Sequence, residues 1–265
     1  MTPTAHPRAR LIVTAGVLAL ALTACGGSSA ASPSPAATYT LVQVNLCLSG
    51  IAGCYAKVAY PAGVDETAAL IRRVHPDAAT FSEACRNDVT RIARETGYHL
   101  RFSTVVYGPG PFRCVRPGGR GLFGDAILTR GAILATQNHA FRGQAGPERR
   151  RWLCVTTRAG VDVCTAHLAT RDAVEVAGND SQCTELAAVL ARRRDARAVI
   201  FGGDVNRPTP CAPAGFWIRT DASGGQSPGL QQAYGRGALR AAAAEVLPFA
   251  HSDHDVLLVR SRLTR

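Results

Sequence analysis

Seven polar residues of this chain are of the types that hold metal ions, activate water or contact phosphate. Hydrolysis of a phosphodiester needs charge stabilisation at phosphorus, an activated water and a proton for the leaving oxygen. Carboxylate and amide oxygens suit a hard divalent cation, a further carboxylate can orient the water, and imidazoles titrate near neutrality. The residues are Asn45, Glu83, His167, Asp204, Asn206, Asp253 and His254.

Each residue alone also has an ordinary structural explanation, so the argument depends on their order along the chain. They lie in a series of short motifs: QVNLC (43–47), FSEAC (81–85), GDAILT (124–129), TAHL (165–168), GGDVNRP (202–208) and SDH (252–254). From residue 39 to the end, this series resembles the endonuclease/exonuclease/phosphatase superfamily, whose fold is that of deoxyribonuclease I.

The resemblance implies a fold, a cofactor and a role for each residue. The fold would be a four-layer α/β sandwich, two packed mixed sheets flanked by helices. The cofactor would be Mg²⁺, or Mn²⁺ or Ca²⁺, held by Glu83, Asp253 and Asn45. The catalytic residues would be His167, Asp204, Asn206 and His254.

Two positions depart from the family pattern. Members usually carry an aspartate between the GDxN and SDH motifs that holds the SDH histidine in its catalytic tautomer, but here Gln232 and Ala233 stand where it is expected. Either Asp221 or Asp255 replaces it, or the protein is a slow or differently tuned member. Asp125 stands where asparagine is commoner; we expect it on the surface, with an added metal ligand as the alternative.

Arginine and net charge bear on the substrate. The formal charge is +11, and about +9 remains without Arg8 and Arg10. A basic exported domain suits a polyanion such as nucleic acid. Two arginine clusters, in PFRCVRPGGRG (111–121) and GPERRRW (146–152), suit phosphate contact, and we select Arg120 and Arg150 as phosphate-binding residues.

Strand and helix patterns alternate at first and strands then run consecutively, which favours layered α/β sheets. Strands are expected at 39–48, 76–85, 121–130, 151–158, 161–168, 196–206 and 254–260. Helices are expected at 64–75, at 87–98 with a stop at Gly97, and at 181–194 with Ser181 as cap. Residues 237–248 fit a strand or a helix. The polar motif residues fall near strand ends, where sites gather in such folds.

The first residues form a leader. Residues 1–25 have a basic start and an apolar run too short to span a bilayer, and they end in a lipobox-like LTAC. We expect a signal peptide ending at a lipidated Cys25, a flexible linker at 26–37 and one domain at 38–265. The protein would be exported, either as a membrane lipoprotein facing outside or secreted, and monomeric.

Eight cysteines remain after Cys25, an even number that favours disulfides in an exported chain. Two local pairs are expected. Cys154 and Cys164 flank a hairpin, and Cys47 and Cys54 close a short loop. The other pairings stay open.

Three functions fit these observations. The first is a metal-dependent nuclease acting on DNA or RNA. The second is a phospholipid phosphodiesterase of sphingomyelinase type, which needs an exposed apolar loop and could use only Trp152 or Trp217, with APAGFWIR (212–219) as the candidate loop. The third is a surface binding protein that kept the fold and lost turnover.

Overall fold

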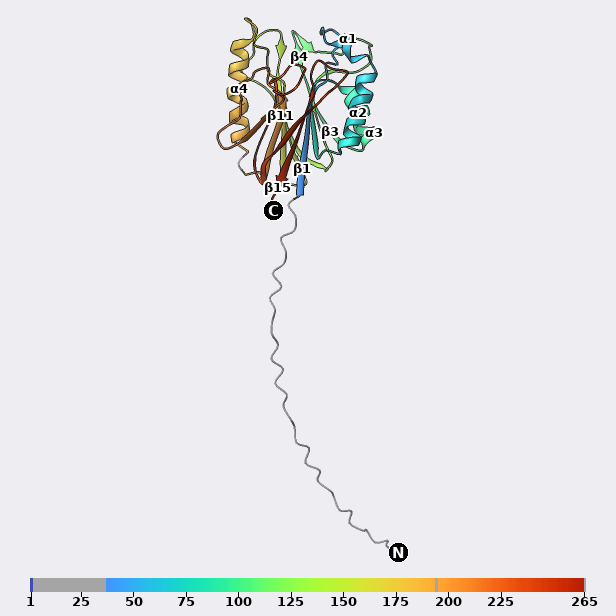
Figure 1. The fold of residues 1–265 in the computed structure, drawn as a ribbon, viewed down its shortest axis with the longest axis vertical. Helices are drawn as coiled ribbons and strands as arrows, with labels where there is room; N and C mark the ends of the chain where they lie inside the picture. The colour runs from blue at the N-terminus through green and yellow to red at the C-terminus, as the bar shows by residue number, and fades with distance from the viewer. Residues whose placement is uncertain (2–36, 194, 265) are drawn as a thin grey trace. The chain divides into compact units, whose positions relative to one another are not determined.

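The computed structural model describes residues 1, 37–193 and 195–264. Ala36–Arg265 form one compact unit, drawn in colour in Figure 1. The expected leader, linker and lipidated Cys25 lie outside the described residues. Within the described ranges, no helix has the length and apolar character needed to cross a membrane.

The first of two six-stranded sheets carries the N- and C-terminal strands side by side. Its order is β14-β15-β1-β2-β6-β3. Only β1 and β2 pair in parallel, and the other neighbours are antiparallel. The strands are β1 (Ala37–Asn45), β2 (Ala78–Cys85), β3 (His99–Thr104), β6 (Phe123–Thr129), β14 (Leu239–Leu247) and β15 (Val256–Leu263).

The second sheet has the order β12-β13-β11-β10-β9-β7, with β10 and β11 parallel and the rest antiparallel. Every residue of β10 and β11 is buried, as expected for strands covered on both faces. The strands are β7 (Ile133–Ala140), β9 (Arg151–Thr157), β10 (Val161–Ala166), β11 (Ala198–Asp204), β12 (Trp217–Thr220) and β13 (Gln231–Gly237).

The two sheets pack face to face, and their inner side chains form one apolar cluster. Leu41 and Ile127 of the first sheet join Val163 and Ile200 of the second, and all four are fully buried. Apolar β-branched and leucine side chains on alternate strand positions produce this sandwich core. Each outer sheet face is covered by helices.

Three helices lie beside the first sheet and one beside the second (Figure 1). They are α1 (Tyr55–Val58), α2 (Ala62–Val74), α3 (Arg86–Thr96) and α4 (Val176–Ala191). In α2 and α3 the apolar residues recur on one face, which packs on the first sheet. The expected four-layer sandwich is therefore the observed fold. A small sheet of β4 (Val106–Tyr107), β5 (Gly110–Pro111) and β8 (Glu148–Arg149) lies at one end.

Most expected elements are present, with one correction. The helix expected at 181–194 begins at Val176, so Ser181 lies inside α4 and does not cap it. The 237–248 segment, which fitted a strand or a helix, is strand β14 and pairs antiparallel with β15 at the sheet edge. Glycine stops α3 as expected, since Gly97 has a φ of 76°.

The described residues contain four disulfides, a number typical of an oxidising environment. The two local pairs, Cys47–Cys54 and Cys154–Cys164, are confirmed. The other two bonds are Cys85–Cys114 and Cys183–Cys211. Cys85 follows Glu83 closely, and its bond holds the arginine-rich loop after β5 beside that strand.

Four chain segments meet at the same edge of the sandwich. β1 ends at Asn45 and β11 at Asp204, and His167 follows β10 in a parallel bridge with Asp204. β15 is antiparallel to β1, so the residues just before Val256 return to this edge. The topology therefore brings the motif residues together.

Candidate active site

Asp204 is the centre of a buried polar cluster at this edge. The Nδ2 of Asn45 donates to its Oδ2 at 3.0 Å, and the backbone N–H of Asn206 donates to its Oδ1 at 3.0 Å. The Nε2 atoms of His167 and His254 lie 3.7 and 3.6 Å from Oδ2. Two imidazoles therefore flank one carboxylate.

Asn45 links this carboxylate to Glu83. Its Nδ2 also donates to Glu83 Oε1 at 2.9 Å, while its Oδ1 accepts the Cys47 N–H at 3.0 Å. The backbone N–H of Asn45 donates to Gln231 Oε1 at 2.8 Å. The Asn45 Nδ2 therefore bridges Glu83 and Asp204 as a donor to both.

The backbone at three positions of the cluster is left-handed. The φ angles are 54° at Glu83, 52° at Asn206 and 49° at Cys47. At Glu83 the pairing of β2 with β6 shifts register between Phe81 and Ala84, a bulge that re-aims the side chain. Such conformations cost about 1 kcal/mol or more each and persist where the surroundings enforce them.

The two carboxyl groups have opposite pKa shifts. Burial raises the pKa of Glu83 to about 7, against the hydrogen bond from Asn45. Burial acts to raise the pKa of Asp204 as well, but the neighbouring imidazoles of His167 and His254 and the hydrogen bonds from Asn45 and the Asn206 N–H together hold it below its usual value. Asp204 is therefore the ionised group of the pair at neutral pH.

His167 is neutral in this environment. Burial, followed by the charge of Arg150, lowers the pKa of His167 to about 3. Its Nε2 lies 3.0 Å from Asn206 Nδ2, which can only donate, so the network assigns the imidazole proton to Nδ1. Asn206 Nδ2 also donates to Leu168 O at 2.9 Å, which fixes the amide.

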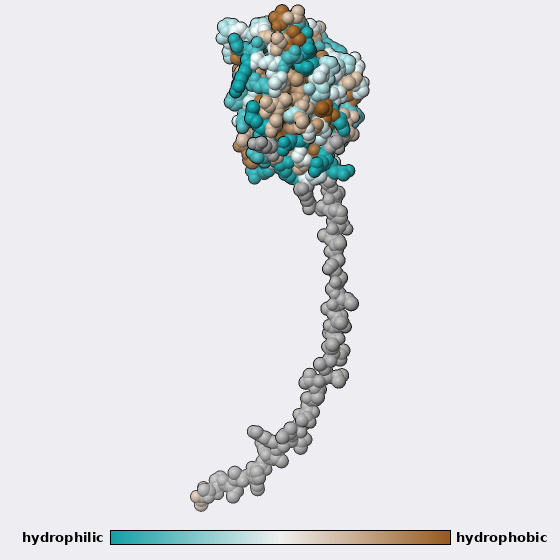
Figure 2. All heavy atoms as spheres, turned by 90° about the vertical axis from the view of Figure 1, so that its left-hand side faces the viewer, coloured by the Kyte–Doolittle hydropathy of each residue, from teal (hydrophilic) through white to brown (hydrophobic). Residues whose placement is uncertain are grey.

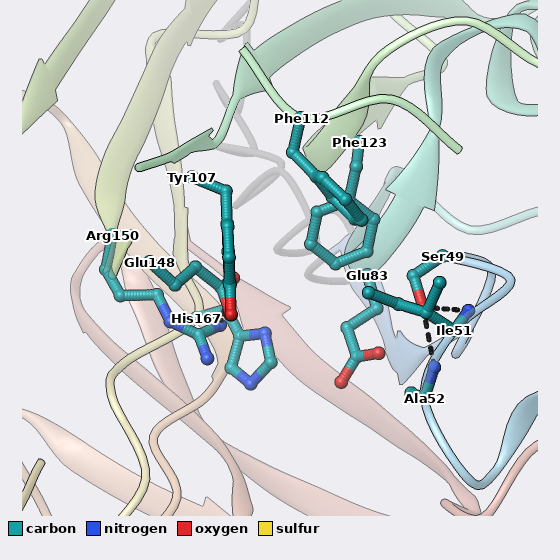
Figure 3. A pocket seen from close by; sticks show the side chains of 10 residues that line it. All are labelled: Ser49, Ile51, Ala52, Glu83, Tyr107, Phe112, Phe123, Glu148, Arg150 and His167. Carbon is teal, nitrogen blue, oxygen red and sulfur yellow. Dashed lines mark hydrogen bonds and ion pairs between the residues drawn. The ribbon is translucent and has the colours of Figure 1, made fainter. Parts of the chain in front are cut away.

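Arg150 brings a buried cation to the cluster. Its side chain lines the same cavity as Glu83 and His167, and the residue is only 5% exposed (Figure 3). Nη1 lies 3.1 Å from Glu148 Oε1 as an ion pair, but Nε and Nη1 have no hydrogen-bond partner. Buried donors are normally satisfied, so these two are available to an anion.

Arg120, which we expected to contact phosphate, lies apart from this cluster. Its guanidinium is buried in an ion pair with Asp88 at 2.8 Å, donates to Arg116 O, and stacks over the Tyr60 ring at 4.3 Å. The cation is thus neutralised inside the loop that Cys114 holds. We leave Arg120 out of the site for this reason.

Asp253 and Asp255 have different positions. Asp253 is half-buried, its backbone O accepts the Ser227 hydroxyl, and its Oδ1 lies 3.4 Å from Ser252 Oγ. The Asp255 carboxylate accepts from the backbone N–H of Gly225 and Gln226 and from the Gln226 amide. Asp255 therefore holds a loop and does not replace the missing aspartate.

The family of this chain follows from comparison with known proteins. The model of the Endonuclease/Exonuclease/phosphatase family matches residues 51–254. The chain belongs to this family. Its members are hydrolases that act on phosphodiester bonds. A search of curated proteins finds no match.

Solved structures of the same fold are similar over most of the chain. An endonuclease/exonuclease/phosphatase from Beutenbergia cavernae is 20% identical with a TM-score of 0.63, covering 85% of this chain and 72% of that one. The human Nocturnin catalytic domain with bound sulfate is 16% identical with a TM-score of 0.62 (86% and 94% covered). D. rerio TDP2 complexed with a single strand DNA product is 15% identical with a TM-score of 0.57 (85% and 99% covered).

No carboxylate in the described part of the chain holds His254 as the family's missing aspartate would, because His254 Nδ1 has no hydrogen-bond partner. Gln232, the position we expected, points away from the cluster, because its Nε2 donates to Arg207 O. Gln231 faces the cluster instead and donates to Asp221 Oδ2 at 3.1 Å and to Asp255 O. Asp221 is fully buried, and burial raises its pKa against the Gln231 hydrogen bond, the Gly229 N–H and the charge of His254.

Asp125 is not on the surface, as we had expected. It is 2% exposed, and its Oδ2 has no hydrogen-bond partner. Burial raises its pKa to about 8, with Arg150 opposing and Glu148 and Glu83 adding to the rise. The reason is its place in β6, a strand whose residues are all buried between β2 and β3.

Sequence analysis missed several residues of the site wall. Glu148, Tyr107 and Phe112 line the cavity with Glu83. Phe112 and Glu148 lie within the two arginine-rich segments 111–121 and 146–152, in which arginine is the more evident signal. Tyr107 gave no signal, because the short strands β4 and β5 have no periodicity to detect.

The donor set of the cluster fits a hard divalent cation. Glu83 and Asp204, joined through the Asn45 amide, offer carboxylate oxygens, and burial raises the pKa of Glu83 despite the opposing charge of Arg150. Cys47 and Cys54 lie close to Glu83, but their disulfide removes both thiolates as ligands. The oxygen-only set therefore suits Mg²⁺, Mn²⁺ or Ca²⁺ better than zinc.

Proposed function

We propose that this protein is an exported, divalent-metal-dependent phosphodiesterase whose substrate is nucleic acid. The observation that carries the proposal is the Asp204 carboxylate between the imidazoles of His167 and His254. Beside it lie Glu83 and the unpartnered donors of Arg150. The carboxylates of Glu83 and Asp204 suit a cation and the guanidinium of Arg150 suits an anion, as a metal-bound phosphate requires.

The catalytic roles follow from the contacts. Asp204 stays ionised, so it orients and polarises the attacking water. Asn206, held by Leu168 O and His167 Nε2, presents its amide beside that position. His254 has a buried Nδ1 without a hydrogen-bond partner and an Nε2 near Asp204, so it donates to the phosphate or to the leaving oxygen. Arg150 binds a non-bridging oxygen.

Glu83 and Asp253 would hold the metal ion. The ion supplies charge stabilisation for the phosphate when bound. Asn45 would be the third ligand through its Oδ1, which accepts one hydrogen bond from the Cys47 N–H and keeps a second lone pair. Its Nδ2 holds Glu83 and Asp204 in register.

Nucleic acid is favoured over phospholipid on two grounds. The basic charge suits a polyanion, and D. rerio TDP2, of the same fold, is complexed with a single strand DNA product. Membrane docking through tryptophan has no support, because Trp152 is buried and Trp217 donates to Leu239 O within the core. On the face over α4, hydrophilic and hydrophobic residues are mixed (Figure 2).

Export and anchoring belong to the same proposal. The four disulfides suit an oxidising compartment, and Cys25 would carry the lipid that ties the domain to the outer face of the membrane. We propose that the domain works as a monomer.

A plasmid assay tests the function. The purified oxidised protein should nick supercoiled plasmid with Mg²⁺ or Mn²⁺ and not with EDTA. Glu83→Gln should lose this nicking, while Glu245→Gln, a surface partner of Arg260, should retain it. No cleavage of the plasmid or of single-stranded DNA by folded protein with any metal would reject the nuclease. Hydrolysis of sphingomyelin vesicles would then support the phospholipid enzyme, and its absence the binding protein.

A further inference from the structure

A cavity of about 240 Å³ opens beside the Asp204 cluster. Glu83 and His167 form part of its lining, so a group bound there lies next to the position proposed for the scissile phosphate. Figure 3 shows Tyr107 with its hydroxyl directed toward Glu148, Arg150 and His167, and Phe112 and Phe123 on the other side above Glu83. The remaining lining residues are Ser49, Ile51 and Ala52.

One wall of the cavity is aromatic. The ring centroids of Tyr107 and Phe112 are 5.6 Å apart, and those of Phe112 and Phe123 are 5.3 Å apart in an edge-on arrangement. Phe112 is fixed by the β4–β5 hairpin, because its N–H donates to Val105 O. Tyr107 is 44% exposed at the mouth. A flat apolar group would find ring faces here.

The other wall is polar. Glu148 Oε1 and Arg150 Nη1 form an ion pair at 3.1 Å, but neither atom has a hydrogen bond, and the buried Nε of Arg150 has no hydrogen-bond partner either. Leaving such groups unpaired is costly, so an occupant that supplies donors and acceptors at its edge is favoured. The cavity therefore calls for a ligand with flat apolar faces, a polar edge and an attached phosphate.

We propose that this cavity binds the unpaired nucleobase of the nucleotide adjoining the scissile phosphate. The base stacks on Tyr107 and Phe112, an exocyclic amine or ring N–H donates to Glu148, and Arg150 binds the attached phosphate. This inference rests on the proposed nuclease function and narrows its substrate to single-stranded or unpaired nucleic acid.

A nucleobase fits these walls better than a lipid chain. Every base has two π-faces for stacking and a hydrogen-bonding edge. An acyl chain would cover the rings but leave Glu148 and Arg150 without partners. A base inside a duplex is stacked on both faces and has its edge paired, so it must leave the stack to enter.

The test compares a single-stranded oligonucleotide with the same oligonucleotide carrying abasic residues around one phosphate. Wild type should cleave this phosphate in the abasic oligonucleotide about 5- to 150-fold less efficiently than in the normal one, the range expected from stacking of one base. Tyr107→Ala should lower cleavage of the normal site and leave the abasic site nearly unchanged. Leu134→Ala, at an exposed residue of β7, is the matched control and should behave like wild type.

Three results would overturn the inference. The first is equal cleavage of the normal and abasic sites by wild type. The second is a Tyr107→Ala variant that loses both activities equally. The third is hydrolysis of sphingomyelin vesicles that depends on Tyr107, because the cavity would then take a lipid.

A binding measurement separates this inference from the proposed function. If neither oligonucleotide is cleaved, the nuclease proposal fails, and fluorescence anisotropy with the two labelled oligonucleotides still decides on the cavity. Tighter binding of the normal oligonucleotide, lost in Tyr107→Ala, would support a base-binding cavity without catalysis. Equal affinities would reject it.

Discussion

Replacement of Arg150 by methionine separates binding of phosphate from a structural role. The residue is 5% exposed and has two buried donors without partners. Its one ionic partner, Glu148, lies 3.1 Å away. A buried guanidinium with two donors that lack hydrogen bonds contributes little to stability, so we expect Arg150→Met to impair activity far more than folding.

The size of both effects follows from these contacts. A hydrogen bond to a charged group contributes about 1.5–3 kcal/mol, so loss of one phosphate contact should lower kcat/KM by about 10- to 150-fold. The change removes two buried donors that have no hydrogen bond. It leaves Glu148 without its cation, and because burial already raises the pKa of Glu148, this carboxyl takes up a proton. The free energy of unfolding should therefore fall by less than about 2 kcal/mol, below the cost of an uncompensated buried charge.

The assay is steady-state cleavage of single-stranded DNA, with urea unfolding of the same preparations. Arg149→Met is the matched control, because Arg149 is the exposed neighbour in the same triplet, and it should change kcat/KM less than 3-fold, on the order of a surface-charge effect. Arg150→Met with near wild-type kcat/KM would refute the phosphate role. A large loss of stability with little loss of activity would show that Arg150 is structural.

Two further predictions concern stability and the loop beside Glu83. Burial raises the pKa of Asp125 to about 8, so the folded protein keeps a proton that the unfolded chain releases near pH 4, and stability should fall as pH rises from about 4 to about 8. Asp125→Asn should therefore gain stability over wild type at pH 8.5 but not at pH 4 in urea unfolding, and an equal difference at both pH values would contradict the shift. Replacing both Cys47 and Cys54 by serine should lower the nicking rate at least 10-fold, about the energy of one hydrogen bond, because the Cys47 N–H orients Asn45. Replacing both Cys154 and Cys164 should lower only the free energy of unfolding, by about 2–4 kcal/mol. Equal activity in the two double variants would contradict the role of the Cys47–Cys54 bond in orienting Asn45.

The sequence was sufficient to predict the layered fold, because its evidence is local and repeated. The helix at 64–75 and the buried strands at 161–168 and 196–206 are visible from period and composition. The two local disulfides were predictable for the same reason, since each closes a short segment. The predicted start of α4 was wrong because residues 176–180, VAGND, lack a helix-forming pattern and are held by packing.

The site was only partly predictable, because side-chain direction depends on tertiary register. The motif series identified His167, Asp204 and His254, which the structure brings together. It could not tell Gln231 from Gln232, since a one-residue difference in a strand selects opposite faces. Nor could it show that Arg120 is neutralised by Asp88, a partner 32 residues away.

Burial reverses the expectation for Asp125. A carboxylate in a strand usually lies on the surface, and only the pairing of β6 between β2 and β3 shows that Asp125 is buried. The aromatic cavity was equally hidden, because Tyr107, Phe112 and Glu148 meet through short strands of a small sheet. Non-local pairing thus determines which polar residues face the site.

The central claim is that Asp204 is the ionised carboxylate on which hydrolysis depends. The most direct measurement is nicking of supercoiled plasmid by Asp204→Asn beside wild type, at saturating Mg²⁺, with urea unfolding of both proteins. Asparagine keeps the shape and the hydrogen bond from the Asn206 N–H but removes the charge between the two imidazoles. We predict a loss of at least about 1,000-fold, on the order of losing an essential carboxylate, from a protein that remains folded. Nicking within about 3-fold of wild type, a change under 1 kcal/mol, would contradict the account.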